Sequence, residues 1–163
     1  MTGIIVGIDG SDHSQRALEW AVQEAAIRAV PLTVIAVYRA VAGLWGGPML
    51  YPQDSGLSAR AREDAEEATE KAMANAGGAR PASVTVREIR GIPAEELVRA
   101  SEDADMVVVG SRGTGGFARL LLGSVSSQVV HHAHCPVVVV PGADRSRLRY
   151  ATIAAEGSVS CGV

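Results

Sequence analysis

The chain has 163 residues, of which 47% are hydrophobic, and a formal net charge of -3 at pH 7, which suits one domain with a full core. This charge argues against non-specific binding to nucleic acid or to an anionic membrane surface, and no apolar run reaches the length of a membrane span. No signal-peptide pattern is visible, and the 2 cysteines make no disulfide framework. We therefore expect a cytoplasmic protein.

The first predicted elements are a strand and a helix. Apolar residues at 4–8 predict a short strand that ends in the turn Asp9-Gly10-Ser11. Ser11 or Asp12 is a suitable cap for the helix that follows, and Pro31 is expected to end it. The predicted inner face of this helix carries small and apolar side chains: Ala17, Leu18, Ala21, Ala25 and Ala29.

The middle of the chain continues the alternation. Residues 32–37 predict a second strand, and 41–56, rich in Gly and Pro, predict a long loop. A stripe of alanines predicts a helix over 58–76 with a glycine stop after it. Residues 83–89 alternate apolar and polar side chains, as in a strand near a sheet edge. A helix is expected to begin at Pro93.

The last part of the chain holds the most distinctive pattern. Residues 105–110 form a continuous apolar run, as in a parallel strand that is buried on both faces. A glycine-rich loop follows, and Gly123-Ser124 opens a predicted helix with an inner face of Val125, Val129, Val130 and Ala133. Residues 137–140 are all valine and predict a fifth strand. We expect one domain over 1–142 and a C-terminal surface tail over 143–163.

Five strands that alternate with four helices predict an α/β fold with a single doubly wound parallel sheet, strand order 3-2-1-4-5, and helices on both faces. In such a sheet a ligand binds at the reversal of strand order, outside the carboxyl ends of the strands. Here those ends are Asp9-Gly10-Ser11 and residues 110–116.

Residues at this crevice fit a phosphate ligand. The amides of Gly110 and Gly113, together with those of Arg112 and Thr114, are expected to face a polyphosphate. The Arg112 side chain adds charge-assisted hydrogen bonds. Gly123 lets phosphate oxygens reach the first amides of the next helix, where the hydroxyls of Ser124 and Ser126 are further donors.

Two residues are candidates for the nucleoside. Asp9 is an acceptor for a ribose hydroxyl or an adenine amine, and Val37 offers an apolar contact to a base. The alternative interpretation needs no ligand: the glycines form plain turns, Ser124 caps a helix, and Asp9 caps the first helix.

Other site chemistries fit less well. A Walker-type phosphate loop is absent from the sequence. Residues 113–118 match a loose dinucleotide pattern, but they follow the fourth strand and lack the acidic partner. His131, His134 and Cys135 are too few for a closed structural zinc site, so no metal ligands are predicted.

Three separated segments, in order, resemble the universal stress protein family in its ATP-binding branch. They are the run 6–14, the spacing Gly110, Gly113, Gly123-Ser124, and the run 123–140. The resemblance covers residues 3–141. It implies a doubly wound domain that binds ATP, often as a dimer, in stress-linked regulation, with Mg²⁺ (or Mn²⁺) held mainly by the phosphates.

Carried over by position, the resemblance places Asp9 and Val37 against adenine and ribose, and Gly7 on the first-strand side of the pocket. Residues 110–116 would wrap the ribose and phosphates, and 123–126 would hold the phosphates. The expected nucleotide-binding residues are therefore Gly7, Asp9, Gly10, Val37, Gly110, Ser111, Arg112, Gly113, Thr114, Gly116, Gly123, Ser124, Val125 and Ser126.

The apolar fifth strand would be a sheet edge, which is an aggregation risk when it is left open. We predict a homodimer through Val137–Val140; a tail that folds over this edge is the alternative. For function, an ATP-binding regulatory protein is favoured, because no clear general base is visible beyond Asp9 and hydrolysis would be slow at most. The alternatives are a weak ATP hydrolase or adenylyl transferase, and a nucleotide-free interaction protein.

Overall fold

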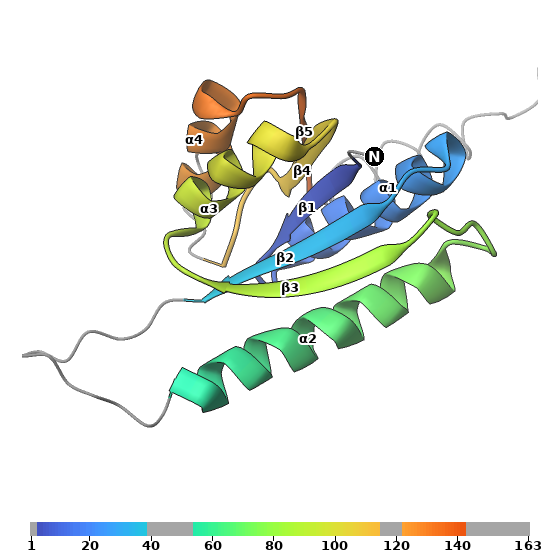
Figure 1. Ribbon diagram of the computed structural model, residues 1–163, viewed down its shortest axis with the longest axis horizontal. Coiled ribbons are helices and arrows are strands. Elements are labelled where there is room, and N and C mark those ends of the chain that lie inside the picture. The colour runs from blue at the N-terminus through green and yellow to red at the C-terminus, as the bar shows by residue number, and fades with distance from the viewer. Residues whose placement is uncertain (1–2, 39–53, 115–121, 143–163) are drawn as a thin grey trace, which may run out of the picture.

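The structure is a computed structural model that describes residues 3–38, 54–114 and 122–142 (Figure 1). Its elements are β1 (Ile4–Ile8), α1 (Asp12–Arg28), β2 (Leu32–Tyr38), α2 (Asp54–Asn75), β3 (Val84–Arg90), α3 (Pro93–Ala100), a 3-10 turn η1 (Ser101–Asp103), β4 (Met106–Gly110), α4 (Ser124–His132) and β5 (Val137–Val140). The five strands pair in parallel in the order β3-β2-β1-β4-β5. The predicted fold and strand order are confirmed.

Helices cover both faces of the sheet (Figure 1). α1 and α2 pack on one face, where Leu18 and Ala72 are buried. α3 and α4 pack on the other, where Leu97 and Val129 are buried. Burying apolar side chains on both faces is the main stabilising contribution to such a sheet.

The central strand β4 belongs to both cores. Met106 and Val108 point into the core under α1, while Val107 and Val109 point into the core under α3 and α4. This alternation follows from the two-residue period of a strand. It explains why the sequence of β4 is apolar throughout, and it holds the carboxyl end of β4 beside that of β1.

The C-terminal end of α1 differs from the sequence prediction. The helix stops at Arg28 because Ala29 adopts the left-handed conformation with φ 54°, and its N–H donates to the carbonyls of Ala25 and Ala26. Ala29 is exposed, so its predicted place on the inner face is wrong. Pro31 follows two residues later and does not itself end the helix.

Two further helix predictions are corrected. α2 begins at Asp54, so Gly56 lies inside this helix rather than in the predicted loop. On α4, Val130 is 45% exposed because Val129 already occupies the packed side and the next residue lies about 100° further round the helix. Residues 41–53 of the predicted loop and the predicted tail lie outside the described residues.

Within the described ranges, no helix combines the length and the apolar character that crossing a lipid bilayer requires.

Candidate functional site

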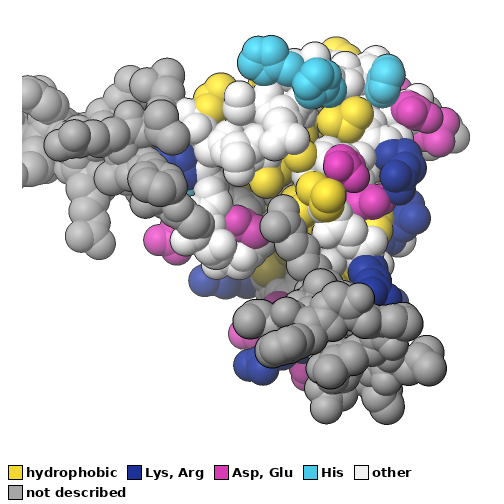
Figure 2. Space-filling model, turned by 90° about the vertical axis from the view of Figure 1, so that its left-hand side faces the viewer, with side chains coloured by type: hydrophobic (Ala, Val, Ile, Leu, Met, Phe, Trp, Pro, Cys, Tyr) yellow, Lys and Arg dark blue, Asp and Glu magenta, His cyan; other side chains and the backbone are white. Residues whose placement is uncertain are grey.

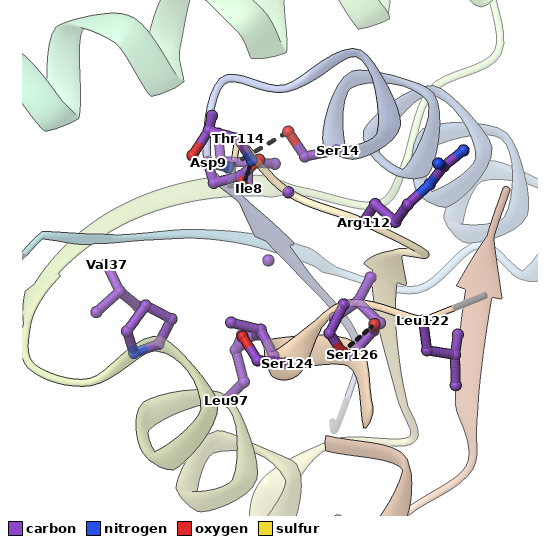
Figure 3. Close-up of a pocket in the computed structure, with 17 residues that line it drawn as sticks. Ile8, Asp9, Ser14, Val37, Leu97, Arg112, Thr114, Leu122, Ser124 and Ser126 are labelled. Atoms are coloured by element: carbon purple, nitrogen blue, oxygen red, sulfur yellow. Dashed lines mark hydrogen bonds between the residues drawn. The ribbon is translucent and has the colours of Figure 1, made fainter. Parts of the chain in front are cut away.

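A pocket with a volume of about 710 Å³ opens at the carboxyl ends of β1 and β4 (Figure 3). β1 pairs with β2 on one side and with β4 on the other. The connections that follow β1 and β4 therefore run to opposite sides of the sheet, and a crevice forms between them. The lining residues are Gly7, Ile8, Asp9, Ser14, Val37, Pro93, Leu97, Val109, Gly110, Arg112, Gly113, Thr114, Leu122, Gly123, Ser124, Val125 and Ser126. A pocket of this size accepts a small organic ligand.

The structure brings most of the predicted site residues together on this pocket: Gly7, Asp9, Val37, Gly110, Arg112, Gly113, Thr114, Gly123, Ser124, Val125 and Ser126. Two predicted residues are not part of the lining. Gly10 forms the turn after β1 with φ 78°, and Ser111 is only 8% exposed. Gly116 lies outside the described residues.

The start of α4 faces the pocket without a side-chain cap. Gly123 is the N-cap residue, and because glycine has no side chain, the N-cap makes no side-chain hydrogen bond to the first turn of the helix. Ser124 is the first helical residue, so the alternative in which Ser124 caps the helix is wrong. First-turn amides have no acceptor within their helix, so Ser124 and Val125, which line the pocket, present donors suited to an anion.

Internal hydrogen bonds tie this helix start to the loop after β4. The Gly123 amide donates to the Ser111 carbonyl over 2.7 Å. The hydroxyl of Ser126 donates to the same carbonyl over 3.0 Å and lies 3.1 Å from the Gly123 carbonyl. A hydroxyl has one proton, and in this structure that of Ser126 is directed at backbone carbonyls, so its side chain positions the loop and its role as a phosphate donor stays a prediction.

The glycines around the pocket have different physical roles. A Cβ at Gly110 would lie 2.7 Å from the carbonyl carbon of His13, in the first turn of α1. A Cβ at Gly7 would lie 2.7 Å from Leu97 of α3. Both glycines are therefore required for packing within the protein, and the predicted role of the Gly110 amide toward a polyphosphate stays a prediction.

Gly123 contrasts with these two. A Cβ there would lie 3.4 Å from the Arg112 Cα and 3.6 Å from the Ser111 carbonyl oxygen, which is close to ordinary contact. Its φ is -75°, a conformation open to any residue. The protein's own packing therefore does not demand a glycine at this position.

The carboxylate of Asp9 joins the two loops that flank the pocket (Figure 3). Its Oδ1 accepts from the amide and the hydroxyl of Ser11, over 3.1 Å and 2.6 Å. Its Oδ2 accepts from the Thr114 amide over 3.1 Å. The N-cap of α1 is Ser11, whose side chain accepts from the Ser14 amide, so the alternative in which Asp9 caps α1 is wrong.

The side chain of Arg112 points away from Val37 and Ser124 in Figure 3. Arg112 lines the pocket, so its guanidinium would have to turn in order to meet an anion at the start of α4.

Several lining residues were not predicted from the sequence: Ile8, Ser14, Pro93, Leu97, Val109 and Leu122. Pro93 and Leu97 come from α3 and form an apolar wall near Val37. Their helical position was predictable, but which end of α3 meets the strand ends depends on the three-dimensional packing. The proximity of Ser14 to Ser11, in the turn after β1, was available from helix geometry, because the amide of the third residue after an N-cap donates to the side chain of that cap.

Histidine side chains gather at one end of the surface in Figure 2. His131, His132 and His134 are exposed, and the described residues contain no group of three or more His, Cys, Asp or Glu side chains that could hold a metal ion. Nearby, burial raises the pKa of the Cys135 thiol, the charge of Asp105 raises it further, and a backbone hydrogen bond at Val107 opposes them. A thiol with a raised pKa is a poor nucleophile at neutral pH.

Comparison with known proteins places this geometry in a family. A family model described as the universal stress protein family matches residues 1–141. Universal stress protein Rv2005c of Mycobacterium tuberculosis is 40% identical over 144 residues, which cover 87% of this chain and 48% of the relative. The chain thus spans about half the length of the curated relatives it matches.

Two solved structures share the fold. Universal stress protein UspA from Lactobacillus plantarum aligns with a TM-score of 0.68 at 28% identity, over 85% of this chain and 97% of that one. The universal stress protein from Archaeoglobus fulgidus, solved in complex with dAMP, aligns with a TM-score of 0.58 at 26% identity, over 86% of this chain and 98% of that one. From its fold, its pocket and these matches, the chain belongs to the universal stress protein family.

Proposed function

We propose that this chain binds ATP in the pocket between β1 and β4 and acts as a cytoplasmic stress-response regulatory protein. The observation that carries the proposal is the uncapped start of α4, which faces the pocket beside Gly123. Free amides and the positive end of the helix dipole favour an anion there. The dAMP complex of the Archaeoglobus fulgidus relative supports an adenine nucleotide as the ligand.

The rest of the lining suits a nucleoside. Val37, Pro93 and Leu97 offer an apolar wall for a base, and Asp9 lies at the carboxyl end of β1 with acceptor oxygens for ribose hydroxyls. The triphosphate would then extend toward Ser124 and Val125. Mg²⁺ or Mn²⁺ would be held mainly by the phosphates, because Mg²⁺ keeps several water ligands and needs few from the protein.

The proposed role is binding rather than catalysis. Asp9 and Arg112 are the ionisable side chains among the described lining residues. Both oxygens of Asp9 already accept hydrogen bonds, which leaves it poorly placed to activate water as a general base. Nucleotide occupancy would be read by partners, and hydrolysis would be slow at most.

The test is Gly123→Val, measured by isothermal titration calorimetry with ATP and Mg²⁺. The branched side chain would fill the space over the first amides of α4, so we expect the binding heat of the native chain to disappear. Replacing an N-cap glycine costs on the order of 1 kcal/mol of stability, so the variant should remain folded, and its urea unfolding curve is the control. ATP affinity equal to that of the native chain would refute the proposal.

Two companion measurements separate the other functions. If the native chain hydrolyses ATP in the presence of Mg²⁺ at a higher rate than Gly123→Val, this would indicate a hydrolase. Purified native protein that carries no nucleotide and shows no heat with ATP would indicate an interaction protein in which the glycine loop has lost its ligand.

A further inference from the structure

The side chain of Asp9 makes one contact that spans most of the chain. The Thr114 amide, 105 residues away in sequence, donates to its Oδ2 over 3.1 Å. Because Oδ1 accepts from Ser11, the two oxygens face different loops. The carboxylate therefore connects the turn after β1 to the loop after β4.

Gly113 lies directly against this carboxylate. A Cβ built at Gly113 would collide with Oδ2 of Asp9, and apart from that carboxylate no described atom outside its chain neighbours lies within 4 Å. The φ of Gly113 lies outside the left-handed region, so its backbone conformation does not call for glycine. The carboxylate of Asp9 is thus the one described feature that excludes a side chain at 113.

The backbone of Asp9 is also held in place. Its amide donates to the hydroxyl of Ser14 over 3.3 Å, and that hydroxyl donates to the Ser11 carbonyl over 2.9 Å. Ser14 is 4% exposed, so this support is shielded from water. With its backbone held in this way and its two oxygens accepting from Ser11 and Thr114, the carboxylate has a defined direction without a ligand.

We infer that Asp9 and Gly113 form a latch in which the carboxylate occupies the space of the missing side chain and holds the Thr114 amide. Asp9 is then a positioning residue: it fixes the loop 110–114 against the end of β1 and preorganises one wall of the pocket. Preorganised loops bind more tightly because less ordering is left for the ligand to impose. The effect of the latch on ATP rests on the proposed function; the latch itself does not.

The first test is a double-mutant cycle of Asp9→Ala and Gly113→Ala, followed by urea unfolding without nucleotide. Gly113→Ala should lower the unfolding midpoint in the native background, because the new Cβ displaces the carboxylate. In the Asp9→Ala background it should leave the midpoint unchanged or raise it, since alanine restricts the unfolded chain. An equal effect in both backgrounds would overturn the latch.

The second test is amide hydrogen exchange at Thr114, followed by NMR. Asp9→Asn keeps one acceptor oxygen, which suffices for Ser11, and should make the Thr114 amide exchange roughly tenfold faster through loss of a charge-assisted hydrogen bond. Ser11→Ala is the matched control: it removes the hydroxyl that donates to Oδ1, keeps the Ser11 amide as a donor to the same oxygen, and should leave exchange at Thr114 unchanged. Native exchange at Thr114 in Asp9→Asn would contradict the inference.

The third test repeats the cycle with ATP titrations. Gly113→Ala should weaken binding roughly tenfold, as expected for the loss of one strong interaction. Asp9→Ala, which also loses the proposed ribose contact, should weaken binding at least as much, and adding Gly113→Ala to it should cause no further loss. Fully additive losses would mean that Asp9 and Gly113 meet the nucleotide separately, and the positioning role would be wrong. If the native chain binds no ATP, the proposed function fails, while the two nucleotide-free tests still decide the latch.

Discussion

At the pocket, a missing side chain serves different purposes at neighbouring glycines. Gly110 admits the backbone of α1, Gly7 admits a side chain of α3, and Gly113 admits the carboxylate of Asp9. At Gly123, the atoms of the protein leave room for a Cβ. The same residue type therefore contributes to stability at some positions and is available for a ligand at another.

This difference predicts unequal losses of stability for two alanine substitutions. Gly110→Ala should lower the free energy of unfolding by about 1–3 kcal/mol, the usual cost of overpacking, because the rigid backbone of α1 lies in the way. Gly123→Ala should cost less than about 1 kcal/mol. Urea denaturation of the two variants makes the comparison, and equal losses would contradict the assigned roles.

The sequence was enough to predict which residues gather at the site. It was not enough to predict which groups their polar atoms contact. Spacing marked Asp9, Gly113 and Ser126 as site residues, and all line the pocket. It could not reveal that the Ser126 hydroxyl is taken by backbone carbonyls or that Asp9 reaches Thr114. Such contacts depend on distances between loops far apart in sequence, which local patterns do not encode.

Among the elements, those with strong local signals were predictable. β4 has an unbroken apolar run, and α3 starts with Pro93 and acidic residues in its first turn. The start of α2 was missed because Gly56 and the prolines before it favour a loop, yet the helix extends through Gly56. Favourable packing of a long helix outweighs the roughly 1 kcal/mol that one glycine costs.

The junction between α3 and β5 depends on one buried side chain. The hydroxyl of Ser101, 1% exposed, donates to the Val98 carbonyl over 2.6 Å and accepts from the His134 amide over 2.9 Å. It therefore fixes the end of α3 to the turn that leads into β5.

We predict that Ser101→Ala lowers the free energy of unfolding by about 1–3 kcal/mol, since the His134 amide is left without its acceptor. Differential scanning calorimetry would measure this as a lower Tm. Gln128→Ala, at an exposed position of α4, is the surface control with an expected change within about 0.5 kcal/mol. A Ser101→Ala variant with native Tm would contradict the structural role.

For the molecule as a whole, alternation of strands and helices was enough to predict the order of the sheet, because right-handed crossovers leave few alternatives. The position of the pocket followed from that order. Assembly beyond one chain remains a prediction: β5 is an edge strand, and the hydrogen bonds from β4 reach the carbonyls of Pro136 and Val140. By the alternation of a strand, the N–H of Val139 then points to the open edge.

We expect the native chain to be a homodimer through β5, and Val139→Pro to make it a monomer. Proline removes the donor on the open side while the bonds to β4 remain, and edge strands tolerate it. Static light scattering at micromolar concentration measures the mass, and urea unfolding checks that the variant folds. A monomeric native chain, or a dimeric Val139→Pro, would count against this interface.

The contact between Asp9 and Thr114, 105 residues apart in sequence, can form only late in synthesis. A ribosome releases β1 and α1 early, but the other wall of the pocket arrives only when residues 106–126 have emerged. A nascent chain that stops before β4 would therefore lack both the ligand pocket and the strand that the two hydrophobic cores share. Contacts this distant in sequence form slowly, so nucleotide recognition is among the last properties that the growing polypeptide acquires.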